Sequence, residues 1–196
     1  MNAAPALGFP PHGAAAIPTP ALLEERGILL RHAEASDIPF LRRLYASLRE
    51  EEMASVPWSP AAKQAFLDNQ FALQHVHYVN HYRDADFLLV EQRGKPIGRY
   101  YVLRDPSDFL IVDISLERGS RGQGIASALI QQTQDEAGGR GAGVQLHVQY
   151  GNEGARLLYE RLGFRRVADE GTHQRLRWMP DAKSNDTHTD THVGTG

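Results

Sequence analysis

The sequence predicts a single α/β domain, and three observations support this fold class. Segments with the apolar and β-branched composition of strands alternate along the chain with segments whose apolar residues recur at helical spacing. The most apolar strand, at 109–116, is followed by a glycine-rich turn and then by a helix. No internal repeat is present. Residues 25–181 therefore have the length and the order of elements of one domain.

Local signals explain where these elements begin and end. Ser36-Asp37 begins the first helix, and Ser59-Pro60 supplies the cap and the first position of the second. Arg93-Gly94-Lys95 has the composition of a hairpin turn, and Gly163 ends the last helix. In chain order we expect a strand at 28–33, helices at 36–52 and 59–81, strands at 86–92, 96–103 and 109–116, a helix from 122, a strand at 144–150, a helix at 153–162, and strands at 164–168 and 174–179.

Two histidines of the second helix share one of its faces. His77 and His81 are four residues apart, whereas His75 points to the opposite side at 3.6 residues per turn. Phe66 and Leu73 lie on the same stripe as His77, which predicts that this stripe packs against the core. Two imidazoles do not complete a metal site, and no metal is expected.

Composition excludes several classes of protein. The chain has no cysteine, which removes disulfides, thiolate metal sites and a thiol nucleophile. Its net charge is -3, so no general attraction to nucleic acid is expected. No apolar run approaches membrane-spanning length, and the first twenty residues lack the basic start and apolar core of a signal peptide. These observations predict a cytoplasmic protein without a membrane partner.

The two ends of the chain differ in composition from the domain between them. Residues 1–24 are rich in Ala and Pro at their start, and residues 182–196 are mostly Ser, Thr, Asp, His and Gly. Such segments bury too little apolar surface to offset the entropy of ordering them. We therefore expect a disordered leader at 1–24 and a disordered tail at 182–196.

The glycine-rich turn after strand 109–116 has the features of an anion site. The first N–H groups of a helix have no partner within it and lie at the positive end of the helix dipole. Gly122 and Gly124 carry no Cβ, so a phosphate can approach their backbone, and Arg121 adds a positive charge. A P-loop would need lysine where Ile125 stands, and a dinucleotide-binding fingerprint would need a third glycine where Ser127 stands. We therefore expect this turn to bind a pyrophosphate group.

Two motifs together resemble the GNAT superfamily of N-acetyltransferases. Arg121-x-x-Gly124-x-Ala126 is similar to that family's acetyl-CoA motif. The run from Asn152 to Phe164, which closes with Tyr159-x-x-x-Gly163-Phe164, is similar to its next helix. The resemblance implies a mixed, mostly antiparallel central sheet of about six to seven strands with helices on both faces.

The resemblance also implies how acetyl-CoA, the expected cosubstrate, is held. The strands at 109–116 and 144–150 would part at their ends and admit the pantetheine arm as though it were an extra strand. Backbone groups of Ile114, Ser115 and Leu116 would then face the pantetheine and the thioester. Asn152 would cap its helix or bind a pantetheine amide, and both roles stay open. The pyrophosphate would be cradled by Arg121, Gly122, Gln123, Gly124, Ile125, Ala126 and Ser127.

Three residues are candidates for proton transfer. By the resemblance, Tyr159 donates a proton to the departing thiolate, and its hydroxyl suggests more than packing. Asp113 is the first candidate for the base, because a carboxylate within an apolar strand must be paired or used. A structural hydrogen bond to a neighbouring loop is the alternative for Asp113, and His147 or a water chain is the reserve base.

The expected activity is direct transfer of an acetyl group from acetyl-CoA to a primary amine, without a covalent enzyme intermediate. The acceptor is a small-molecule amine or a peptide amine, and its pocket is expected to involve Trp58, Tyr100, Tyr101, Arg104 and the helix 59–81. The charged run 49–52 is a solvated helix end or an acidic rim that attracts a cationic acceptor. The alternative function is an acyl-CoA-binding regulatory module without turnover. The resemblance further suggests a homodimer.

Overall fold

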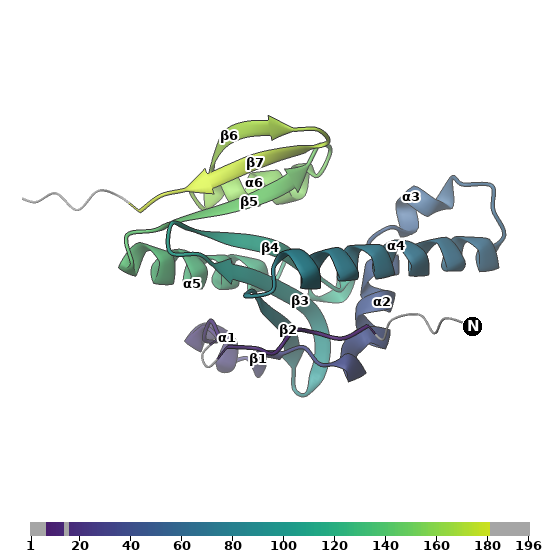
Figure 1. Ribbon diagram of the computed structural model, residues 1–196, viewed down its shortest axis with the longest axis horizontal. Helices are drawn as coiled ribbons and strands as arrows, with labels where there is room; N and C mark the ends of the chain where they lie inside the picture. The colour runs from purple at the N-terminus through teal and green to yellow at the C-terminus, as the bar shows by residue number, and fades with distance from the viewer. Residues whose placement is uncertain (1–6, 14–15, 181–196) are drawn as a thin grey trace, which may run out of the picture.

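The computed structural model describes residues 7–13 and 16–180 (Figure 1). Its helices are α1 (Ala21–Glu24), α2 (Ile38–Ser47), α3 (Glu50–Ala54), α4 (Pro60–His81), α5 (Ile125–Gly139) and α6 (Glu153–Arg161), with 3-10 turns at Ala35–Asp37 and Arg118–Ser120. Its strands are β1 (Ile28–His32), β2 (Asp86–Gln92), β3 (Lys95–Arg104), β4 (Asp108–Leu116), β5 (Gly143–Gln149), β6 (Arg165–Glu170) and β7 (His173–Trp178). Within these ranges no helix is both long and apolar enough to cross a membrane.

The seven strands form one sheet in the order β1-β2-β3-β4-β5-β7-β6. Every neighbouring pair is antiparallel except β4 and β5, which run parallel and are connected through α5. A parallel pair requires such a crossover. Short turns join the consecutive antiparallel strands β2–β3, β3–β4 and β6–β7, whereas the β1–β2 and β5–β7 pairs form between strands that are separated in the chain by other elements. The predicted α/β domain with a mixed, mostly antiparallel sheet is therefore confirmed.

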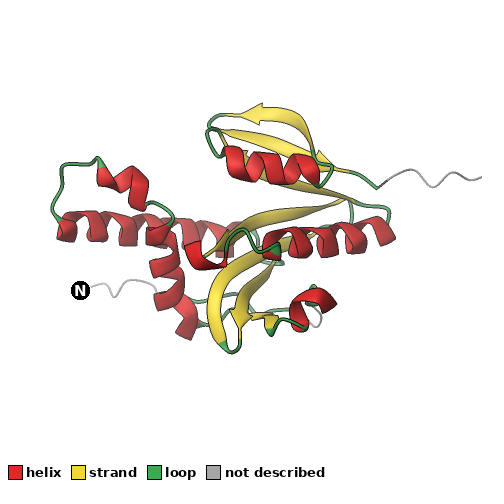
Figure 2. Ribbon diagram, turned by 180° about the vertical axis from the view of Figure 1, so that it is seen from behind, coloured by secondary structure: helices red, strands yellow, loops and turns green. Residues whose placement is uncertain are grey.

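Helices cover both faces of the sheet, and each face has its own apolar core. On one face, α5 and α6 pack over a core that includes Tyr100, Phe109 and Leu129, and Figure 2 shows these two helices in front of the strands. On the other face, α2 and α4 pack over a second core that includes Phe71 and Phe87, and Figure 1 shows α4 crossing β3 and β4. The sheet thus separates two apolar cores.

Strands β4 and β5 pair over only part of their length. Their parallel register joins Asp108–Ile111 to 143–146 and ends there. Beyond this point β4 continues to Leu116 and β5 to Gln149, so the β4 edge that faces β5 has no strand partner at 112–116. An unpaired strand edge presents N–H and C=O groups that can bind an extended ligand. The glycine loop, which we define as residues 121–127, follows directly after this edge.

Residues 16–24 differ from the disordered leader that composition predicted. Ile17 and Leu23 are almost fully buried in the core on the α5 side, and α1 packs against α5. The Thr19 side chain accepts a hydrogen bond from the Leu30 amide at 2.9 Å. Two apolar side chains with good burial outweigh the Ala and Pro content of the segment. Residues 1–6 and the predicted tail beyond 181 lie outside the described residues.

The prediction for the buried stripe of α4 was wrong. Phe66 and Leu73 are 39% and 59% exposed, and His77 and His81 stack on each other at the surface with ring centroids 4.6 Å apart. The buried residues are instead Leu67, Phe71 and His75. Both sets recur at helical spacing, so periodicity alone could not choose between them. The orientation of α4 is set by its packing against α2 and the sheet, which the periodicity of its own sequence does not specify.

The predicted first helix is also divided. It ends at Ser47, and α3 begins at Glu50, because Arg49 has φ −115° and ψ 8° and so leaves the helical conformation. The first turn of α3 is exposed and consists of Glu50, Glu51 and Glu52. Carboxylates at this end of a helix interact favourably with the helix dipole.

Candidate active site

The glycine loop holds a row of unpartnered amides at the start of α5. Gly122 and Gly124 adopt φ values of 71° and 77°, a left-handed conformation that only glycine accepts easily. Gly124 is the N-cap of α5 and brings no capping side chain. Among the described residues, none of the N–H groups of 122–127 has a hydrogen-bond partner. Six donors thus face a ligand or water at the positive end of the α5 dipole.

The space beside these amides fits a diphosphate. A Cβ added at Gly122 or Gly124 would meet no atom within 4 Å, so the backbone is open to a close approach. Arg121 is exposed, and its Nε donates to the Leu116 carbonyl at 3.0 Å. That bond holds the guanidinium between the end of β4 and the loop, with its terminal N–H groups available. The donors and charge match the chemistry of a diphosphate.

One further residue, which no sequence motif marks, binds the glycine loop. Arg26, which follows α1, donates from Nη1 to the Gln123 carbonyl at 3.0 Å and from Nη2 to Gln123 Oε1 at 3.4 Å. Gln123 in turn donates from Nε2 to the Gly119 carbonyl at 2.8 Å. No local pattern links residues that lie 97 positions apart.

Tyr159 is buried in the core on the α5 and α6 side, 7% exposed and packed near Phe164. Burial and, to a smaller extent, the negative charge of Asp113 together raise the pKa of the Tyr159 phenol to about 12. The hydroxyl therefore remains protonated at neutral pH, so it can donate a hydrogen bond or a proton to a group on which negative charge develops.

Asp113 accepts four hydrogen bonds in the structure. Arg99 donates to it from Nε at 3.0 Å and from Nη2 at 2.8 Å. Tyr78 of α4 donates at 3.1 Å and Ser115 at 2.7 Å. Because the Arg99 and Asp113 side chains are 4% and 11% exposed, protonating the carboxylate would break a buried ion pair. The geometry favours the alternative in which Asp113 has a structural role. Its hydrogen-bond partners lie on strands and on α4, and not on a neighbouring loop as expected.

The other predicted residues are placed by β4, β5 and α6. Ile114 and Leu116 pack on the core through their side chains and leave their backbone at the unpaired edge. Asn152 caps α6 by accepting from the Ala155 amide at 3.2 Å, which leaves its side-chain NH₂ free of partners among the described residues. His147 lies on the exposed side of β5, with Nε2 3.0 Å from Glu170 Oε2.

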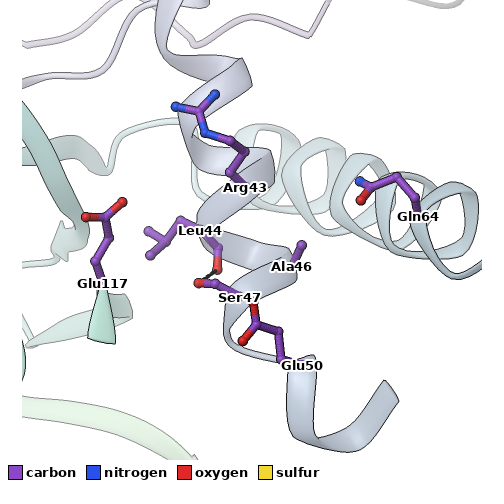
Figure 3. Close-up of a pocket in the computed structure, with 7 residues that line it drawn as sticks. All are labelled: Arg43, Leu44, Ala46, Ser47, Glu50, Gln64 and Glu117. Carbon is purple, nitrogen blue, oxygen red and sulfur yellow. Dashed lines mark hydrogen bonds between the residues drawn. The ribbon is translucent and has the colours of Figure 1, made fainter. Parts of the chain in front are cut away.

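A hollow of about 330 Å³ lies between α2 and the C-terminal end of β4 (Figure 3). Figure 3 shows Glu117, which follows Leu116 directly, on the β4 side of the hollow, and Glu50 below Ser47 on the helical side. Ser47 donates to the Leu44 carbonyl at 2.8 Å within α2. We call this cavity the α2 hollow; its lining residues are Arg43, Leu44, Ala46, Ser47, Glu50, Gln64 and Glu117.

The residues that were expected to shape an acceptor pocket do not line the α2 hollow, apart from Gln64 of α4. Tyr100 and Tyr101 are completely buried, and the Tyr100 hydroxyl lies 2.6 Å from Thr133 Oγ1. Arg104 is bound in ion pairs with Asp86 and Glu136. Their aromatic and charged character suits a pocket and a core equally well, and only the fold separates the two.

Comparison with known proteins agrees with this geometry. Residues 41–164 match the model of the "Acetyltransferase (GNAT) family". The N-alpha-acetyltransferase RimI of Mycobacterium tuberculosis is 32% identical over 111 residues, which span 57% of this chain and 63% of that protein. The match thus covers less than two thirds of that relative.

Solved structures share the fold at low sequence identity. The PaiA N-acetyltransferase of Thermoplasma acidophilum, in complex with coenzyme A, has a TM-score of 0.59 at 14% identity over 78% of this chain and 98% of its own. The RimL ribosomal L7/L12 alpha-N-protein acetyltransferase, also with coenzyme A, has a TM-score of 0.56 at 18% identity over 85% and 98%. With the family model matched over most of the chain, and the glycine loop, parted strands and buried tyrosine in place, this protein belongs to the GNAT acetyltransferase family.

Proposed function

We propose that this protein is an acetyl-CoA-dependent N-acetyltransferase that transfers an acetyl group directly to a primary amine. One observation carries the proposal: the row of unpartnered amides in the glycine loop, flanked by Arg121 and placed directly after the unpaired edge of β4. A diphosphate bound there directs an attached pantetheine arm along that edge. Both features are needed for a coenzyme of this shape, and either alone would be less specific.

Each part of the site has a role in the transfer. The glycine loop holds the diphosphate of acetyl-CoA through residues 121–127, and the free edge of β4 at Ile114, Ser115 and Leu116 aligns the thioester. A backbone amide near Leu116 stabilises the negative charge on the carbonyl oxygen. As the amine nitrogen bonds to the acetyl carbon and the carbon–sulfur bond breaks, Tyr159 gives its proton to the thiolate. With no cysteine in the chain, we propose no acyl-enzyme intermediate.

Asp113 has a different role in this proposal from the one expected of it. A buried arginine and two hydroxyl groups bind its carboxylate, so it has no free position for the proton of an amine. We propose that Asp113 ties β4 to α4 and keeps the Tyr159 phenol protonated through its charge. The proton of the attacking amine passes to water or to another group at the parted strands.

For the acceptor we propose the amine at the N-terminus of a protein or peptide. The M. tuberculosis relative is an N-alpha-acetyltransferase, which supports an α-amine over a lysine side chain. The α2 hollow opens next to Leu116, where the thioester is proposed to lie. Glu50 and Glu117 outnumber Arg43 among its charged lining residues, which gives the hollow a net negative charge that attracts an ammonium group.

Coenzyme binding is tested by calorimetry with a matched pair of glycine variants. Gly124 and Gly94 have φ values of 77° and 74°, and a Cβ at either meets no atom within 4 Å. The two glutamate variants therefore carry the same backbone strain and charge change, one in the glycine loop and one in the β2–β3 hairpin. Acetyl-CoA should raise the melting temperature of the wild type and of Gly94→Glu, but not of Gly124→Glu. Equal binding by both variants would overturn the proposed site.

Turnover and acceptor class are tested together. Peptides with a free α-amine, the same peptides with a blocked N-terminus and an internal lysine, and small amines are each incubated with acetyl-CoA. Release of free thiol and mass spectrometry of the product then report turnover. We expect acetylation of the free α-amine peptides. Thiol release no faster than with water alone would favour an acyl-CoA-binding module, and acetylation of small amines alone would reject the peptide acceptor.

A further inference from the structure

We propose that Arg26 is a positioning residue for the coenzyme, which acts by fixing the peptide group between Gln123 and Gly124 in the glycine loop. The inference rests on the proposed function, since it assumes that this loop holds a diphosphate. It adds a component from the N-terminal segment, which lies outside residues 41–164 that match the family model.

The segment that carries Arg26 is firmly anchored. Leu23, in α1, is 0% exposed and belongs to the same core as Ile125, the first residue of α5. The turn after α1 is closed by bonds from the Arg26 amide to the Leu23 carbonyl at 3.0 Å and from the Gly27 amide to the Glu24 carbonyl at 2.8 Å. The Gly27 carbonyl accepts from the Arg93 amide at 2.8 Å. Arg26 therefore starts from a fixed backbone, so the guanidinium loses less freedom when it binds the loop.

The effect on the loop follows from the geometry of a peptide bond. No cis peptide occurs in the described chain, and in a trans peptide the C=O and N–H groups point in opposite directions. Arg26 Nη1 binds the Gln123 carbonyl at 3.0 Å, so the N–H of the same peptide group, which belongs to Gly124, points away from Arg26. That N–H is one of the six unpartnered donors. Fixing the carbonyl therefore fixes the donor.

Glycine makes this support necessary. Gly122 and Gly124 flank Gln123, and both have left-handed φ values in a conformation with few steric limits. Such a peptide can rotate and turn its N–H away from the ligand. Arg26 opposes that rotation from outside the loop, and Gln123 Nε2 opposes it from inside through the Gly119 carbonyl at 2.8 Å. A pre-oriented donor loses less entropy when the diphosphate binds.

Charge adds to the orienting effect. Arg26 and Arg121 approach the loop from different elements, whereas Arg118 is engaged with Glu51 at 2.7 Å. If the peptide group turned over, the Gln123 carbonyl would direct its negative end at the bound phosphates. By binding this oxygen, the guanidinium keeps it directed away from them and contributes a positive charge of its own.

The test is the affinity for acetyl-CoA, measured by isothermal titration with the full chain. Arg26→Ala should weaken the binding of acetyl-CoA about tenfold, raise its KM to match, and leave kcat within about twofold, since the thioester and Tyr159 keep their places. Arg26→Lys, which keeps one donor and the charge, should recover part of the loss. Arg83→Ala removes an exposed arginine from the turn between α4 and β2 and is the control for net charge. It should bind like the wild type.

Two further readouts separate this role from others. Acetyl-dephospho-CoA lacks the 3′-phosphate but keeps the diphosphate, so Arg26→Ala should lose the same factor for both ligands. A loss confined to acetyl-CoA would place Arg26 on the 3′-phosphate and overturn the proposed route. Unchanged affinity in Arg26→Ala, or a lower melting temperature without ligand as its only effect, would also overturn it. Failure of the proposed function looks different, because Gly124→Glu would then bind acetyl-CoA as the wild type does.

Discussion

The two faces of the sheet differ in the groups that make their key contacts and in how far apart those groups lie in the sequence. On the face covered by α5, the site is made mostly of backbone groups, and its elements lie within one stretch of chain from β4 to the start of α5. On the face covered by α4, the organising contacts are made by side chains from distant segments, such as Arg99, Asp113 and Tyr78. Sequence patterns describe the first kind of site well. The second kind depends on which elements meet in space.

The largest expected effect concerns the two stripes of α4. Phe71 is 0% exposed in the core on the α4 face, whereas Leu73 is 59% exposed on the opposite stripe. Phe71→Ala should lower the free energy of unfolding by about 4 kcal/mol through lost burial and a cavity. Leu73→Ala should change it by less than about 0.5 kcal/mol. Urea denaturation of both variants checks the assignment, and a larger loss in Leu73→Ala would reverse the orientation of α4.

Next in size is the buried ion pair of the same face. Asp113→Ala should lower the free energy of unfolding by about 3 kcal/mol, since Arg99 would be left buried without its partner. The double variant Arg99→Met with Asp113→Leu removes both charges and should recover most of that loss. If Asp113→Asn were instead as stable as the wild type but inactive, with the acid limb of its pH–rate profile gone, Asp113 would be the base.

Features that neighbouring residues encode could be predicted from the sequence, whereas contacts between distant segments could not. The order of the elements along the chain and the glycine-rich turn before α5 were predictable, because local composition and spacing encode them and a left-handed turn before a helix has few solutions. Arg26 was not predictable, because its partner lies 97 residues away. The α4 stripe was ambiguous, since Phe66 and Leu73, seven residues apart, and Leu67 and Phe71, four apart, are both spaced as on one face of a helix. The burial of Ile17 was not predicted, because the Ala and Pro residues around it indicated a disordered segment.

Tyr159 tests the chemistry on the coenzyme side. Tyr159→Phe should lower kcat about 100-fold, equivalent to about 2.7 kcal/mol, and leave the KM for acetyl-CoA near its original value. Tyr150→Phe is the control, since Tyr150 is 48% exposed and donates to Asp169 at 2.6 Å. With the Tyr159 pKa raised to about 12, the wild type should keep its activity between pH 8 and 10 without a descending limb from this group. Full activity in Tyr159→Phe would remove the tyrosine from the mechanism.

The smallest expected effect is a pH dependence of stability on the α4 face. Burial lowers the pKa of His75, and its Nε2 donates to the Gly8 carbonyl at 2.9 Å. The unfolded chain then binds more protons than the folded one below about pH 6.5, the ordinary histidine pKa. Stability from this group is thus complete above pH 6.5 and is lost as the pH falls below it. Melting temperatures between pH 5 and 7.5 should show the trend, and His75→Gln should reduce it. A wild type more stable at pH 5 would contradict the sign.

The most direct test of the central claim is a titration of ¹⁵N-labelled protein with acetyl-CoA, followed by NMR of the backbone amides. We expect the largest shifts at Gly122, Gln123 and Gly124 and at the first amides of α5, because these N–H groups lack partners in the structure. Amides of the β2–β3 hairpin around Gly94 should stay in place. Saturable binding with the glycine-loop amides unmoved would show that the coenzyme binds elsewhere.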